Sequence, residues 1–188
     1  MPVPESAQIN QLIRELAESS RSAETLRAAH PAAELLRRSG EQRWSAAECI
    51  EHLNLTNRAY LAKIDKALAT LVEKKLKSDG PFRLEWNARL LKFWLEPPSR
   101  LRLPTTAPFQ PVKAKDATIT FMDFFALNEQ LTERLKSARD LDLSAAKIAS
   151  PFAENVKYSV YSAFVLIGAH NRRHLWQAES ALSAIRHK

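Results

Sequence analysis

Glycine, cysteine and long apolar runs are scarce or missing in this 188-residue sequence, which has three glycines and one cysteine. With so few glycines, the sequence lacks the closely spaced turns that are typical of an all-β protein. The lone cysteine, Cys49, excludes a disulfide framework within the chain and fits a reducing cytoplasm. No run of about 18 apolar residues is present, so we expect no membrane-spanning helix. Residues 1–5 lack a basic segment followed by an apolar one, so we expect no signal peptide and a cytoplasmic protein.

Acidic residues are outnumbered, since 28 Lys and Arg stand against 21 Asp and Glu, which gives a formal net charge of +7. Such an excess can attract nucleic acid, an anionic membrane surface or anionic small molecules. The basic residues are spread along the whole chain and are not gathered into one stripe. This favours a soluble protein with a basic surface over a nucleic-acid-binding protein, whose affinity would fall steeply with salt.

The sequence does contain long stretches with apolar residues at three- and four-residue steps, which are typical of amphipathic helices. They predict four long helices, at about residues 5–29, 45–77, 116–138 and 159–185. Residues 139–155, which include the breaker Ser150-Pro151-Phe152, are expected to form a loop. The length suits one domain with a sizeable core. We therefore predict an all-α fold in a single domain over residues 1–188.

The clearest helix start lies at Ser45. Ser45 and Glu48 have the spacing of a capping box, in which the serine accepts from the third backbone N–H and the glutamate reaches back to the cap. Trp44 and Cys49 stand where a hydrophobic staple would pack. These positions favour a capping role for Glu48 over a general base. They also favour a packing role for Cys49, although its C-x-x-H spacing with His52 could hold a metal.

Residues 81–115 form the irregular part of the chain and hold six of its ten prolines. Residues 82–95 carry two of the four tryptophans, Trp86 and Trp94, with basic residues between them. Three interpretations stay open for this segment: a short helix that covers the bundle or lines a pocket, a dimer contact, or a helix at a membrane surface. The proline-rich part that follows predicts an ordered crossover or a lid, because long connections without a role are uncommon.

His170 and His174 stand four residues apart, one turn along the same predicted helix. At this spacing two imidazoles can share one metal ion. A wheel at about 100° per residue places both on one flank of the apolar stripe, facing the interior or a cleft, and places Arg172 and Arg173 on the surface. Two buried imidazoles need partners for their nitrogens, which a metal ion, carbonyls or carboxylates can supply.

The other three histidines give weaker signals. His52, in the first turns of the second long helix, lies off the centre of its apolar stripe, on the side shared by Cys49 and Thr56. This is compatible with a ligand only if that end of the helix faces a cleft. His30 and His187 are expected to be incidental surface residues.

Three segments in this order resemble the DinB-like superfamily. Residues 44–53 (WSAAECIEHL) join a tryptophan to Ser-x-x-Glu and a histidine, and residues 150–159 lead from Ser-Pro-Phe to Tyr-Ser before the last helix. Residues 170–177 form H-x-x-x-H followed by Leu-x-Gln. The resemblance covers nearly the whole chain. It implies a four-helix bundle with up-down-down-up connectivity and one long crossover, which here would carry the short extra helix.

The resemblance also implies a metal site. Carried over to this sequence, His52, His170 and His174 would hold a divalent ion, zinc or nickel, with an open position for water or substrate. The superfamily includes bacillithiol transferases, a mycothiol-dependent maleylpyruvate isomerase and metal-dependent hydrolases. It therefore implies a metal-dependent enzyme that activates either a thiol, for S-transfer, or a water, for hydrolysis, on a small-molecule substrate. No general base is evident, because Glu51 fits a solvated side chain equally well.

The alternative is a non-catalytic bundle that binds a ligand or partner through the region of Trp86 and Trp94. Exposed tryptophans near the crossover also favour a homodimer, in which they would be covered. If the protein transfers a thiol, its basic surface would suit an anionic low-molecular-weight thiol.

Overall fold

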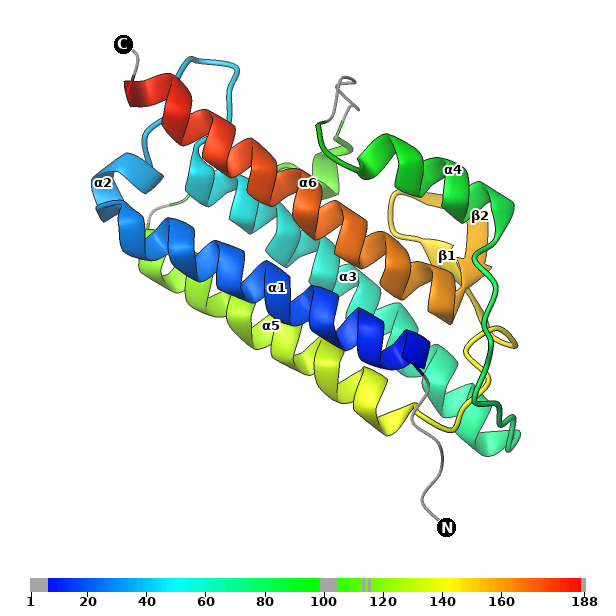
Figure 1. The fold of residues 1–188 in the computed structure, drawn as a ribbon. Helices are drawn as coiled ribbons and strands as arrows, with labels where there is room; N and C mark the ends of the chain where they lie inside the picture. The colour runs from blue at the N-terminus through cyan, green and yellow to red at the C-terminus, as the bar shows by residue number, and fades with distance from the viewer. Residues whose placement is uncertain (1–6, 99–104, 113, 115, 187–188) are drawn as a thin grey trace.

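A computed structural model describes residues 7–98, 105–112, 114 and 116–186 of the chain. Its main body is a bundle of four long helices (Figure 1), α1 (Ala7–Ala29), α3 (Ala46–Glu73), α5 (Ala117–Ser137) and α6 (Val160–Arg186). α1 and α6 run in one direction and α3 and α5 in the other, so the connectivity is up-down-down-up. α3 and α5 are parallel, and the chain must therefore return along the bundle between them. The predicted all-α bundle is confirmed.

Shorter elements surround the four helices. α2 (Ala32–Leu35) is a single turn after α1, and the crossover carries α4 (Trp86–Leu95) and the 3₁₀ turn η1 (Ala107–Phe109). α4 lies along the outer side of α6 (Figure 1). Its Ala88 and Leu95 are buried in the core. The segment is therefore a short helix that covers the bundle, and the interpretations as a dimer contact or a membrane-surface helix, which concern its exposed side, stay predictions. None of the described helices is long and apolar enough to cross a bilayer.

The predicted loop at residues 139–155 was partly wrong. β1 (Lys147–Ser150) and β2 (Ala153–Ser159) form an antiparallel hairpin, in which buried Ile148 lies opposite buried Tyr158. The strands are too short for a two-residue period to stand out, and Pro151 lies in the turn between them. Tyr158 is anchored by Tyr60 of α3, with their hydroxyl oxygens 2.7 Å apart. This long-range contact holds the hairpin against the bundle.

α3 ends at Glu73, four residues before the predicted end near Lys77. Lys75 adopts a left-handed conformation with φ of 53°, and the Leu76 amide donates to the Leu71 carbonyl while the Lys75 amide donates to Val72. These bonds form a Schellman motif, which usually has glycine at the left-handed position. Because lysine occupies the left-handed position, the sequence contains no indication that α3 ends at Glu73.

One polar chain crosses the bundle interior and takes one residue from each long helix. Asn128 of α5 donates to the Ser20 hydroxyl of α1 at 3.0 Å, and Asn171 of α6 donates to Asn128 at 3.3 Å. Asn57 of α3 approaches the Asn171 amide oxygen at 3.5 Å. Buried amides of this kind favour one helix register, because any slip leaves them unpaired.

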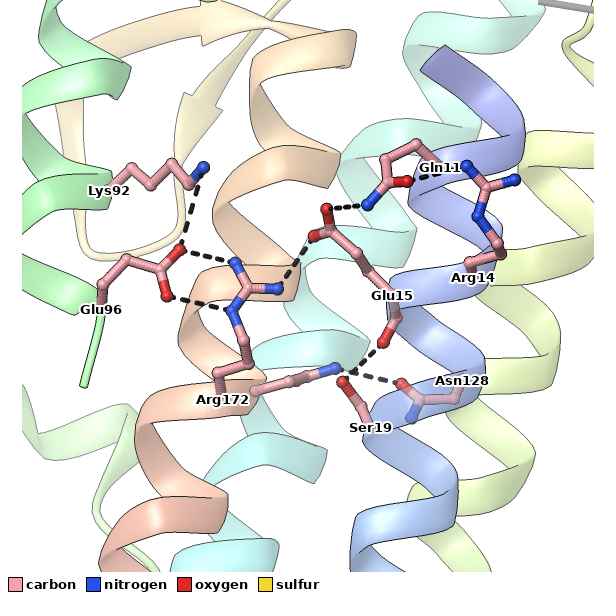
Figure 2. Close-up of polar contacts among 9 residues, drawn as sticks. Gln11, Arg14, Glu15, Ser19, Lys92, Glu96, Asn128 and Arg172 are labelled. Atoms are coloured by element: carbon pink, nitrogen blue, oxygen red, sulfur yellow. Dashed lines mark hydrogen bonds and ion pairs between the residues drawn. The ribbon is translucent and has the colours of Figure 1, made fainter. Parts of the chain in front are cut away.

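The prediction that Arg172 and Arg173 are surface residues was wrong. Arg172 is half-buried and donates to Glu15 of α1 at 2.9 Å and to Glu96, just after α4, at 2.6 and 3.0 Å (Figure 2). Arg173 is only 3% exposed and donates to the Trp94 carbonyl at 2.9 Å. A wheel of α6 alone cannot show that α4 covers this side. Both arginines therefore tie α4 to the bundle.

Candidate metal centre

The position of His52 follows from how α3 begins. Ser45 accepts from the Glu48 amide at 3.2 Å, and the Glu48 carboxylate accepts from the Ser45 amide at 2.8 Å, so the predicted capping box is confirmed. Arg38 also donates to both oxygens of Glu48, whose side chain is buried. The first turn of α3 is thus fixed at both the cap and the third residue. His52 follows on the next turn and is buried.

His170 and His174 project from successive turns of α6 toward His52. One ring nitrogen from each of the three histidines lies within 4.8 Å of the other two. The ring centroids are 4.3 Å apart for His52 and His174, 4.5 Å for His170 and His174, and 5.1 Å for His52 and His170. The fold therefore brings His52 beside two imidazoles that lie 118 and more residues further along the sequence.

The tautomer of His52 is fixed by the crossover. Its Nδ1 lies 2.7 Å from the backbone oxygen of Phe109 in η1. A carbonyl only accepts, so Nδ1 carries the proton and Nε2 keeps its lone pair. That Nε2 lies 3.3 Å from Nε2 of His170. Hydrogen bonding of the outer nitrogen to a carbonyl is the usual way in which proteins orient a histidine ligand.

The spacing of these nitrogens fits a metal ion. Two nitrogens bound at about 2.05 Å to one tetrahedral zinc ion lie about 3.3 Å apart, which matches the His52–His170 separation. A shared proton could also sit between this pair, but it would leave the third imidazole, His174, without a role. The donor set of three imidazoles is that of an open, catalytic type of site, and it suits zinc, nickel or copper.

Burial acts on all three imidazoles in the same direction. It lowers the pKa of His170 and of His174 well below the ordinary 6.5. Repulsion of each protonated ring by the neighbouring imidazoles and by Arg173 lowers these pKa values further. Burial also lowers the pKa of His52, while the bond to the Phe109 carbonyl opposes part of the shift. The rings are therefore neutral at neutral pH, which is the form that binds a metal ion. The Nδ1 atoms of His170 and His174 have no partner within hydrogen-bond distance among the described residues, and the nearby Gln177 side chain opposes part of the fall in the pKa of His174.

Aromatic side chains enclose the cluster. The Trp44 ring lies 5.1 Å from His52 and 6.1 Å from His174, centroid to centroid. Phe152, in the hairpin turn, lies 5.7 Å from His170, centroid to centroid. Phe109 packs against Phe152 with the two ring centroids 4.9 Å apart. These rings come from the α3 cap, the hairpin and the crossover. They give the imidazoles an apolar surround that keeps water from most of the rings.

Sequence reasoning missed three contacts of this site. The Phe109 contact is made by a backbone oxygen, so no residue type could have signalled it. Phe152 belongs to the Ser-Pro-Phe segment that marks a helix break and forms part of the resemblance, but neither indicates a hairpin turn that lies against His170. Trp44 was assigned to a hydrophobic staple, and its second contact, with the histidines, was not foreseen.

Cys49 lies outside the histidine cluster. It is buried in the core beside Trp44, and burial raises the pKa of its thiol to about 12, so it is not a thiolate at neutral pH. Glu51 is half-exposed and accepts from Asn54 at 3.2 Å. Neither residue is placed as a ligand or a base.

His30 was wrongly predicted to be an incidental surface residue. Its side chain is 8% exposed, and its Nδ1 lies 2.9 Å from the Glu34 carboxylate. The pairing forms because the turn at Pro31 leads directly into α2, which brings Glu34 back over the ring. His187 lies outside the described residues.

Fold and site together define a class: a four-helix bundle of up-down-down-up connectivity with a buried cluster of three histidines between α3 and α6. The sequence profile of the DinB superfamily matches residues 11–178. The chain therefore belongs to the DinB superfamily, as the resemblance in its sequence indicated. No curated protein and no solved structure matches the chain.

Proposed function

We propose that this protein is a metal-dependent enzyme in which His52, His170 and His174 hold one divalent ion, zinc or nickel. The observation that supports it most is the 3.3 Å separation of the His52 and His170 Nε2 atoms, with the His52 tautomer fixed by the Phe109 carbonyl. A bound ion would supply a Lewis acid that lowers the pKa of a thiol or water at the open position.

The residues of the chain do the positioning. The Phe109 carbonyl keeps the proton of His52 on Nδ1 and aims Nε2 at the centre of the cluster. Trp44 and Phe152 limit access of bulk water to the imidazoles, which strengthens electrostatic interactions there. The substrate that we propose is a small molecule.

Two reactions fit this site, transfer of a low-molecular-weight thiol to an electrophile and hydrolysis of an ester or amide. The net charge of +7 suits an anionic thiol. A non-catalytic bundle is the alternative function, supported by the exposure of Trp86 and Trp94. The homodimer expected from these tryptophans stays a prediction.

The test compares the turnover of metal-free protein with that of the same protein after metal has been restored. Protein stripped with a chelator and then reloaded with zinc or nickel is assayed with thiols plus electrophiles, and separately with esters and amides. We expect metal-dependent turnover in one series, with kcat/KM lowered at least about a hundredfold in His174→Ala. His30→Ala, which removes a histidine outside the cluster, is the matched control and should retain activity. Equal turnover by stripped and reloaded protein would contradict the proposal.

A further inference from the structure

α4 is apolar on two opposite faces. At about 100° per residue, Trp86, Leu90 and Phe93 lie within about 60° of one another, and the buried Ala88 and Leu95 lie on the opposite side. We call Trp86, Leu90, Phe93 and Trp94 the outer face of α4; they are 79%, 52%, 71% and 42% exposed. A group of exposed large apolar side chains on one side of a helix marks an interaction site more often than a bare protein surface. The outer face therefore has the composition of a surface that binds something.

The charges around the outer face are basic. Arg83 and Arg89 are exposed, and neither forms an ion pair with any residue that the structure describes. The acids at the two ends of α4 are occupied, since Glu85 pairs with Lys147 at 2.9 Å and Glu96 pairs with Arg172 at 2.6 Å. The polar border of the outer face is thus positive.

The outer face is also held firmly in place. Arg172 binds the C-terminal end of α4 through Glu96 (Figure 2), and Arg173 binds the Trp94 carbonyl. At the other end, Glu85 accepts from the Ser159 amide at 2.6 Å, and Asn87 donates to the Lys157 carbonyl at 3.0 Å. Because both ends are tied to the bundle, the aromatic side chains cannot turn inward without breaking these bonds.

We propose that the outer face of α4 docks on an anionic lipid surface. Tryptophan and phenylalanine on a helix bordered by arginine are side chains that partition into the headgroup region of an anionic bilayer. A second copy of the chain fits less well, because two such faces would bring their basic borders together. This inference goes beyond the proposed function and does not depend on the metal site.

The test is co-sedimentation of the full chain with vesicles of phosphatidylcholine, with and without phosphatidylglycerol. We expect binding to the anionic vesicles only, weakening as salt is added. Trp86→Ser/Leu90→Ser/Phe93→Ser should lower the partition coefficient at least about tenfold, since the variant lacks three apolar side chains that the lipid surface would bury. The matched control is Val72→Ser/Ile119→Ser/Met122→Ser, which removes comparably exposed apolar side chains elsewhere and should bind as the wild type does.

Two charge-reversal double variants test the proposal even if the serine variant folds poorly. Arg83→Glu/Arg89→Glu should lose binding, and Lys66→Glu/Lys74→Glu, with the same change in net charge, should lose much less. Absence of binding to anionic vesicles at low salt overturns the proposal. Concentration-dependent self-association that the serine variant abolishes, without vesicle binding, overturns it in favour of a second copy.

Discussion

At the scale of single residues, the most informative side chain outside the histidines is Glu48. Its carboxylate closes the capping box and binds Arg38, so one buried acid joins the α3 N-terminus to the preceding connection. Burial alone would raise the pKa of Glu48, but the bonds from Arg38 and from the Ser45 amide outweigh it and hold this pKa below the ordinary 4.5. The ionised form is therefore the one that stabilises the fold.

This gives a prediction with a definite pH dependence. Glu48→Gln should lower the free energy of unfolding by about 1–3 kcal/mol at neutral pH, because the buried charge-assisted pair with Arg38 is lost, while the glutamine amide oxygen can still accept from the Ser45 amide. The folded pKa lies below the unfolded one, so the contribution of Glu48 is complete above about pH 4.5 and disappears as the pH falls through the folded value. Urea unfolding of both proteins at neutral and acid pH measures it. A difference that stays constant down to strongly acid pH would contradict the assignment.

The residues of the site were predictable to different degrees. His170 and His174 were visible as a pair from their spacing, and the capping box was visible because its two members are three residues apart. His52 depended on the resemblance to the superfamily, since its own helical wheel argued against it. The wheel failed because the side of α3 that carries His52 is covered by η1 and α6, which are distant in the sequence.

At the scale of elements, the long helices were predictable, and so were their ends among the described residues, apart from the C-terminus of α3. The Schellman motif that stops α3 places Lys75 at φ of 53°, where a side chain is strained and glycine is not. The β1–β2 hairpin and the placement of α4 rest on contacts between distant segments, such as Tyr60 with Tyr158 and Arg172 with Glu96. Local periodicity carries no information about such partners.

The strained stop of α3 predicts a stabilising substitution. Lys75→Gly should raise the free energy of unfolding by about 0.5–1 kcal/mol, because glycine adopts the left-handed conformation without the Cβ penalty. Lys74→Gly is the matched control. Lys74 has φ of −81°, so glycine there should lower stability by a similar amount. Thermal or urea unfolding of the two variants compares them, and a loss of stability in both would contradict the motif.

At the scale of the whole molecule, the features that build the site are connections across the bundle. The chain Ser20–Asn128–Asn171–Asn57 links one residue from each long helix and passes beside His170. It favours the register of α6 against α3 in which the imidazoles meet. The overall topology was predictable through the resemblance. The covering of α6 by α4 was not, which is why Arg172 and Arg173 were misplaced.

The central claim is that His52, His170 and His174 hold a metal ion, and elemental analysis of protein purified without an affinity tag tests it most directly. The account predicts about one zinc or nickel per chain in the wild type and in His30→Ala. It predicts loss of that metal in His52→Ala/His170→Ala, with the helical circular dichroism retained. Metal that remains bound to the double variant would contradict the account. So would a wild-type protein that takes up neither metal on reconstitution.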